Sequence, residues 1–131
     1  DKLVTGVQTC ALPISSIECR PAGVFHGPMV VSMRPVASGQ LAKAVTASAR
    51  FPNAHGAPIH IGDPAAIGIT DITKPDWGDA QHFSPGDVPV FWACGVTPQA
   101  VALASKPPFM LTHSPGSMFI TDVPNASLAA L

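Results

Sequence analysis

Proline is the residue that most constrains what this chain can fold into. The 131 residues contain 15 prolines and 11 glycines, together about one fifth of the chain. Proline ends helices, and within sheets it is confined to edges, first positions and bulges, because it lacks an N–H and fixes φ. The prolines recur at short intervals from Pro28 to Pro115. Helices and strands must therefore be short, with frequent turns between them.

Charge is the second constraint. The chain has 7 Lys and Arg against 8 Asp and Glu, a net charge of -1, which disfavours a nucleic-acid or anionic-membrane partner. Charged residues make up 11% of the chain, well below the roughly 25% of an ordinary soluble domain. We therefore expect either a surface poor in charge or a surface that something covers. No apolar run approaches the ~18 residues of a membrane span, and no signal-peptide core is evident.

The first 14 residues have an unusual pattern. The run VTGVQTCALPI at 4–14 resembles the in-frame translation of a DNA-sequencing library adapter, so we expect residues 1–14 to be an artefact and 15–131 to be native. The alternative is a short native strand with a turn at Pro13. A sequencing read that begins in an adapter begins wherever the DNA fragment broke, so we also expect the native gene to extend upstream. Cys19 and Cys94 then remain as free thiols, which favours a cytoplasmic protein.

Strand and helix patterns alternate along the rest of the chain. They predict an α/β fold, a mixed sheet with flanking helices. Residues 70–87 hold four acids and are predicted to be an exposed excursion. The predicted strands are 29–34, 57–62, 88–93, 109–112 and 118–121, and the predicted helices are 38–50 with Ser38 as its cap, a brief one after Asp63-Pro64, and 97–105.

Cys94 lies between a predicted buried strand and a predicted helix N-terminus. There the helix dipole would stabilise a thiolate, or an anionic substrate oxygen beside the amides of Val96 and Thr97. The alternative is a small buried cysteine under a tight turn at Gly95.

Residues 51–64 bring two histidines and an acid within nine positions. If Ile59 and Ile61 face the core, His60 faces the other side, and Asp63 follows where it could orient the imidazole as a general base or, less favoured, a metal ligand. The alternative makes Asp63 a helix cap, His60 a half-buried strand residue and His55 a loop residue.

Further polar residues stand at predicted turns and strand ends. His113 and Ser114 fall on a turn between two apolar strands, where a plain polar turn is the alternative. Arg20 or Arg34 could bind a carboxylate through two parallel hydrogen bonds, with surface ion pairing as the alternative. Motifs for nucleotide binding and for the familiar hydrolase nucleophiles are absent from the sequence.

Several long blocks carry a family resemblance: CRPAG at 19–23, GPMVVSMRP at 27–35, HGAPIHIGDPAAIGI at 55–69, PGDVPVFWACGVTPQ at 85–99, and KPPF with MFITD within 106–122. With them the chain resembles the family of bacterial hydro-lyases to which D-glutamate cyclase belongs. Members are about twice this length and of two-domain size. The resemblance therefore implies that this chain is the C-terminal part of a larger two-domain α/β protein and that the N-terminal half is absent here. Ser117 departs from the pattern, because members often carry a histidine there.

The resemblance implies dehydration of D-glutamate to 5-oxo-D-proline. From residue chemistry, our hypothesis gives Arg20 or Arg34 the α-carboxylate, His60 with Asp63 the role of base, and Cys94 or His113 that of acid. The amides after Gly95 would form an oxyanion hole. His55, Thr97 and Ser114 complete the candidate substrate-binding set.

No cofactor and no metal ligands are assigned, although a divalent metal stays open. The expected partners are a small amino-acid substrate, the missing N-terminal half and, as an open point, a second copy. Two alternatives from other classes are a carboxylate-binding module without turnover and a structural or regulatory partner of an oxoproline-metabolising enzyme. A further alternative is that this piece is inactive alone.

Overall fold

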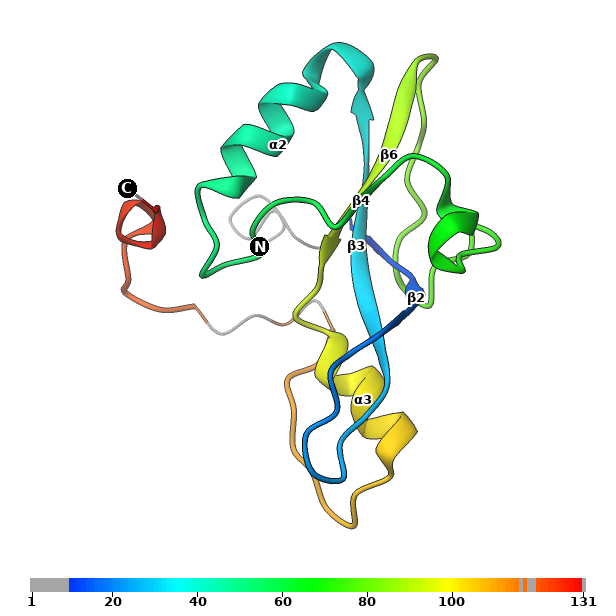
Figure 1. Cartoon of the computed structure of the whole chain (residues 1–131), viewed down its shortest axis with the longest axis vertical. Coiled ribbons are helices and arrows are strands. Elements are labelled where there is room, and N and C mark those ends of the chain that lie inside the picture. Colours follow the sequence, from blue (N-terminus) through cyan, green and yellow to red (C-terminus); the bar gives the residue numbers. More distant parts are fainter. Residues whose placement is uncertain (1–9, 116, 118–119, 131) are drawn as a thin grey trace.

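The computed structural model describes residues 10–115, 117 and 120–130. It shows an antiparallel sheet flanked by helices, which confirms the predicted α/β class (Figure 1). The strand order is β4-β6-β3-β1-β5, with β2 also paired to β3. The strands are β1 (Ala11–Leu12), β2 (Ile14–Glu18), β3 (Pro28–Ala37), β4 (His60–Ile61), β5 (Trp77–Gly78) and β6 (Asp87–Ala93), and the helices are η1 (Ser38–Gln40), α2 (Leu41–Ala49), η2 (Pro64–Ile67), α3 (Thr97–Ser105) and η3 (Asn125–Leu128).

The β3–β6 pair is the centre of the sheet. It runs without a break from Val31 opposite Ala93 to Ala37 opposite Asp87. β3 thus continues past Arg34, where the sequence predicted its end at Pro35. Pro35 stands directly opposite Pro89, whose carbonyl accepts a hydrogen bond from Gly62 on the other side of β6. The backbone of Pro89 therefore faces β4, and neither proline interrupts the ladder between β3 and β6.

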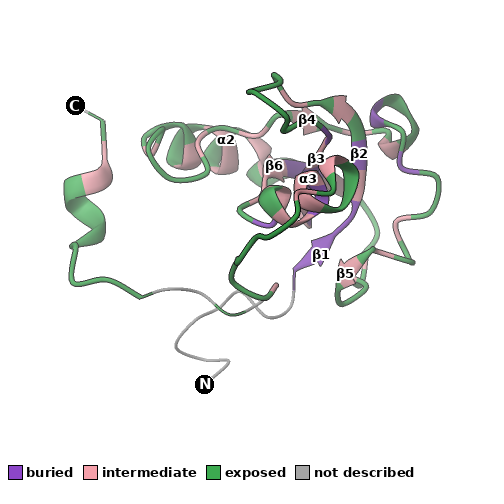
Figure 2. Ribbon diagram, turned by 90° about the horizontal axis from the view of Figure 1, so that it is seen from below, coloured by how far each residue is buried: buried purple, intermediate pink, exposed green. Residues whose placement is uncertain are grey.

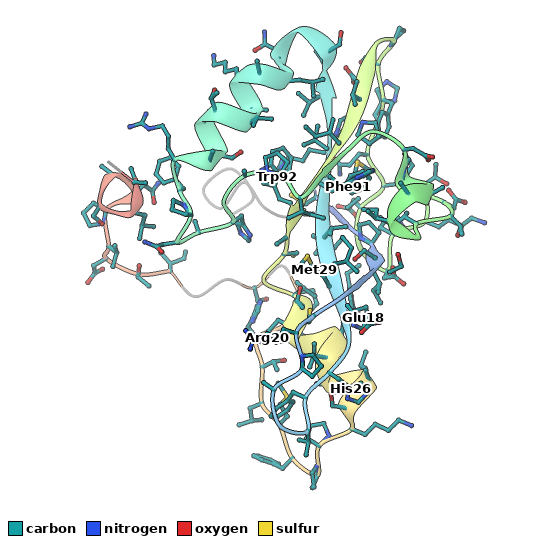
Figure 3. The ribbon with its side chains drawn as sticks, viewed as in Figure 1. Glu18, Arg20, His26, Met29, Phe91 and Trp92 are labelled. Carbon is teal, nitrogen blue, oxygen red and sulfur yellow. The ribbon has the colours of Figure 1, made fainter. Side chains whose placement is uncertain are left out.

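Alternation along these two strands gives the sheet two different faces. Val31, Met33 and Phe91 are fully buried on one of them, together with Ile67 of η2; we call this the η2 face. Residues of the opposite parity point toward α2 and α3, and we call this the helix face. Figure 3 shows Phe91 and Trp92, consecutive in β6, on opposite sides of the strand. Figure 2 shows that burial is concentrated in the sheet.

The two α-helices cover the helix face unequally. α3 has the bounds that the sequence predicted and packs on Val30 through Val96 and Ala100. None of the nine residues of α2, all of them described, is buried. The expected cap at Ser38 is wrong: this residue begins η1, and no side-chain capping bond precedes either η1 or α2. Because α2 packs only loosely, space remains between it and the sheet.

Four other predicted segments differ from the structure. The predicted strand at 57–62 is shorter in the structure, where it is β4. The residues before and after β4 are bonded to β6, through hydrogen bonds from the amide of Ile59 to the Phe91 carbonyl and from the amide of Gly62 to the Pro89 carbonyl. Residues 109–112 are not a strand, and neither are 120 and 121, while 118 and 119 lie outside the described residues. The excursion at 70–87 contains the short β5, which pairs with β1. The apolar pattern of 109–112 was misleading because no described neighbouring strand pairs with it.

Residues 10–14 take part in the sheet. Ala11 pairs with Met33 and with Gly78, and the Pro13 carbonyl accepts a hydrogen bond from Val31. Residues 1–9 lie outside the described residues. The origin of residues 1–14 stays a prediction.

Gly68 allows η2 to end against β2. Its φ is +76°, and a Cβ added there would lie 2.6 Å from Cβ of Ser16. We expect Gly68→Ala to lower the free energy of unfolding by about 2–4 kcal/mol, because the left-handed conformation and the clash add. Gly23→Ala is the control, since Gly23 has a φ of +58° and no atom within 4 Å of an added Cβ. Urea denaturation that found equal losses for both variants would contradict the packing described here.

Candidate active site

A pocket of about 330 Å³ opens on the helix face, between the sheet and the loop that follows α2. We call it the Arg34 pocket. Ser32, Arg34 and Trp92 enter it from β3 and β6, where Ser32 and Trp92 are directly opposite each other. The remaining lining residues are Cys10, Ser48, Phe51, Ala54, His55 and Gly56. The pocket exists because alternate residues of β3 and β6 point toward a helix that stands off from them.

Arg34 places a cation in this pocket. The side chain is half-buried, and its Nη2 donates to Cys10 Sγ at 2.7 Å. A guanidinium can donate two parallel hydrogen bonds to a carboxylate, which also neutralises its charge. A carboxylate is therefore the ligand group that best matches Arg34.

His55 places a base in the same pocket. Its Nδ1 lies 2.7 Å from the carbonyl oxygen of Ala93. A carbonyl can only accept, so Nδ1 carries the proton, and in the neutral ring Nε2 holds the lone pair. His55 lies on the loop that follows α2. Backbone hydrogen bonds from the amides of Ala54 and Gly56 to the Phe51 carbonyl turn this loop. The end of β6 thus fixes both the position and the tautomer of this histidine.

Aromatic side chains form the walls. Trp92 and Phe51 line the pocket and are both half-buried. Apolar walls around a few polar groups are typical of sites for small organic ligands. Such walls can pack against the apolar part of a small ligand, while Arg34 and His55 present polar groups to it.

His60 and Asp63 lie on the other face of the sheet. The His60 ring is 5.6 Å, centroid to centroid, from Phe91 of the η2 face. Its Nε2 donates to the backbone carbonyl of Asp63 at 2.7 Å, not to the carboxylate. The Asp63 carboxylate accepts from the amide of Ala65 and caps η2. The structure therefore matches the capping alternative and does not bring His60 to Arg34.

Cys94 is a half-buried thiol directly after β6. Burial raises its pKa, which the hydrogen bond from the Val96 amide lowers only in part, and nearby Cys10 raises it further. The expectation of a thiolate stabilised by α3 is wrong, because desolvation outweighs that single amide. The amide of Thr97 donates to the carbonyl of Cys94. Both amides after Gly95 thus have partners inside the fold, which leaves no oxyanion hole here.

We expect iodoacetamide at pH 8 to alkylate Cys94 more slowly in the folded chain than in urea, because the thiolate is the nucleophile. The raised pKa also gives a sign for stability. The unfolded thiol ionises near pH 9.0. The contribution of Cys94 to the free energy of unfolding is therefore complete below about pH 9, and it is lost as the pH rises through the raised pKa of the folded thiol. Mass spectrometry of the modified peptide measures the rate. Equal rates in folded and unfolded chain would contradict the burial of Cys94.

Thr97 and Gly95 have structural surroundings. The Thr97 hydroxyl accepts from the amide of Val30 at 3.1 Å and donates to the carbonyl of Cys94 at 2.7 Å. It therefore ties the first turn of α3 to β3. Gly95 is exposed, with no atom within 4 Å of an added Cβ.

The other candidates lie outside the Arg34 pocket. His113 is exposed beside α3, where Gln99 donates to its carbonyl. Ser114 is exposed, and its carbonyl accepts from Ser117. Arg20 is exposed on the β2–β3 connection near α3, far from the labelled Trp92 (Figure 3). Of the ten predicted site residues, Arg34 and His55 are the two that line the Arg34 pocket.

Sequence reasoning missed Ser32, Trp92 and Phe51 as neighbours of Arg34. Alternation along β3 could have identified Ser32, which is two residues from Arg34 and so on the same face. Trp92 needed the register between β3 and β6, which the sequence does not contain. Within the described residues, no group of three or more His, Cys, Asp and Glu side chains is arranged to hold a metal ion. None of the described helices has the length and apolar character that a membrane span needs.

Comparison with known proteins assigns this chain to a family. The model of the D-glutamate cyclase family matches residues 4–122. The chain belongs to the D-glutamate cyclase family. The matched range contains every lining residue of the Arg34 pocket.

Curated members of the D-glutamate cyclase family are close in sequence. A protein named "Putative hydro-lyase" from Thermoanaerobacter sp. (strain X514) is 62% identical over 116 residues, 88% of this chain and 44% of its own length. One from Paracoccus denitrificans (strain Pd 1222) is 59% identical over 120 residues, 90% of this chain and 46% of its own. The chain therefore spans less than half the length of these family members.

Proposed function

We propose that the Arg34 pocket binds a small amino acid by its carboxylate and, within a family-length protein, dehydrates D-glutamate to 5-oxo-D-proline. The observation that carries the proposal is the presence of a guanidinium and a tautomer-fixed imidazole in one aromatic-walled pocket. Membership of the D-glutamate cyclase family supports the choice of substrate.

The proposed reaction forms one C–N bond and breaks one C–O bond. The amine nitrogen of D-glutamate attacks the side-chain carboxyl carbon, and one carboxyl oxygen leaves as water. The nitrogen passes from ammonium to amide and so loses two protons, and the departing oxygen takes up two. Since no net proton or electron is exchanged, the protein has to hold the α-carboxylate and move protons between two atoms of one ligand.

Arg34 and His55 are suited to these two tasks. A guanidinium bound to the α-carboxylate would place the ammonium inside the pocket. Nε2 of His55 would accept a proton from that ammonium and then return it to the departing oxygen. This assignment moves the base from His60 to His55, because His55 shares a pocket with Arg34 and His60 does not.

A cytoplasmic setting belongs to the same proposal. Cys10, Cys19 and Cys94 are all unpaired thiols in the described chain. Free thiols persist in reducing compartments, and the proposed substrate is a soluble amino acid.

We expect His55→Gln to lower turnover by about 10²–10⁴-fold while the affinity for D-glutamate changes little, because glutamine can still donate to Ala93 but cannot accept a proton. His113→Gln is the matched control and should leave turnover unchanged. The assay is formation of 5-oxoproline from D-glutamate and, separately, from L-glutamate. It is run on this chain and, at the aligned position, on the Thermoanaerobacter relative.

The outcomes separate the candidate functions. Conversion of the D-isomer that depends on His55 supports the cyclase proposal. Binding of D-glutamate and 5-oxoproline without conversion in either protein supports a carboxylate-binding module instead. A His55→Gln variant with normal turnover would remove this histidine from the mechanism.

A further inference from the structure

A second hollow lies on the outer side of α3, away from the Arg34 pocket. It is a groove of about 510 Å³ between α3 and the segment 107–115, which turns back along the helix (Figure 1). Lys106 ends α3 with a φ of 50°, and the prolines that follow redirect the chain. Gln99 holds the returning segment through a hydrogen bond to the carbonyl of His113. We call this feature the α3 groove.

Several large apolar side chains line or border the α3 groove and are exposed to solvent. Leu103 of α3 is 68% exposed and Phe109 is 79% exposed, and Leu111 beside them reaches 83%. Single exposed apolar residues are ordinary, but several together mark a surface that contacts something. Lys106 is the one charged side chain that lines the groove in the described structure.

A buried polar atom points to the same conclusion. The side-chain oxygen of Gln99 is buried and has no hydrogen-bond partner in the described structure. Gln99 lines the groove, and its amide nitrogen is used by His113. A buried acceptor without a partner is unfavourable, so the polar groups beside the α3 groove are not fully satisfied in the described structure.

The length of the relatives indicates what covers the α3 groove. Residues 103–111 lie within the range that the family model matches, so the groove belongs to the common part of the family. The matched part makes up 44% of the Thermoanaerobacter relative, so more than half of that protein has no counterpart here. We infer that the α3 groove is an internal docking surface, covered in family-length proteins by a segment of the same polypeptide that these 131 residues do not contain. This inference is independent of the proposed reaction.

The test compares this chain with the Thermoanaerobacter relative by hydroxyl-radical labelling and mass spectrometry. Labelling follows accessible area, so burial of a side chain such as Phe109 should reduce it about fivefold or more in the long protein. Ile61, 42% exposed on β4, is the control and should label equally in both. Equal labelling at the positions aligned with Phe109 and Leu111 would overturn the inference.

A substitution provides the second readout. Leu111→Asp should leave the melting temperature of this chain unchanged, because the side chain is in water, and the aligned substitution should lower that of the long protein. The α3 groove is instead an interface between copies if labelling at Leu111 in this chain falls as its concentration rises. That result, or an unchanged melting temperature in both proteins, would contradict internal docking.

Discussion

Phe91→Ala is expected to lower the free energy of unfolding by about 3–5 kcal/mol, because Phe91 is fully buried at the centre of the η2 face. The ring packs with Val31, Met33 and Ile67, and Phe91 stands opposite Met33 of β3 and His60 of β4. Truncation would leave a cavity that the paired strands cannot close. A loss of this size is a large part of the stability of a typical domain, so much of the variant would be unfolded at 37 °C.

Phe109→Ala is the matched control for this result. Phe109 is 79% exposed, so the same truncation should change the free energy of unfolding by less than about 0.5 kcal/mol. Urea denaturation followed by circular dichroism measures both variants. A loss at Phe109 equal to that at Phe91 would contradict the placement of the core.

Arg34→Met is expected to weaken binding of D-glutamate by about 30-fold, because removing one partner of a half-buried charge pair falls at the low end of the about 2–5 kcal/mol found for buried pairs. Methionine keeps much of the side-chain volume and removes the charge. Half-burial of Arg34 protects such a pair from part of the solvent screening that weakens exposed pairs. Binding of 5-oxoproline should weaken as well, since the product keeps the α-carboxylate.

Arg20→Met is the control, because Arg20 is exposed and lies outside the Arg34 pocket. Isothermal titration calorimetry of both variants provides the comparison. An equal loss in both variants would indicate a nonspecific charge effect. An unchanged affinity in Arg34→Met would show that the carboxylate binds elsewhere.

Local sequence signals were sufficient for much of the fold. α3 follows from Thr97-Pro98 at its start and from Lys106 before two prolines at its end, so its bounds were predicted correctly. The capping pattern of Asp63-Pro64 likewise gave η2. These elements are set by residues close together in the chain, and short-range patterns report on such contacts directly.

Pairing between distant segments was not predictable in the same way. The end assigned to β3 at Pro35 could not take account of the register: Pro35 and Pro89 form a pair that is not hydrogen-bonded, and a proline at such a pair interrupts no bond between the strands. The apolar run at 109–112 was assigned to a strand although it finds no partner among the described strands. Both errors concern tertiary partners rather than local preference.

The candidate site shows the same division. Arg34 and His55 were singled out by residue type, but their meeting depends on the turn after Phe51 and on the bond from His55 to Ala93. His60 and Asp63 looked better paired in sequence, yet they lie on the η2 face, and the Asp63 carboxylate caps η2. A close spacing in sequence did not mean a shared pocket, because strand alternation decides which face each side chain meets.

The most direct test of the Arg34 pocket uses its tryptophan. The chain has two tryptophans, of which Trp92 lines the pocket and Trp77 does not. In a ¹⁵N-labelled sample titrated with D-glutamate, we expect the indole N–H resonance of Trp92 to shift saturably while that of Trp77 stays in place. Absence of a shift at Trp92 at high ligand concentration, or equal shifts at both tryptophans, would contradict ligand binding in this pocket.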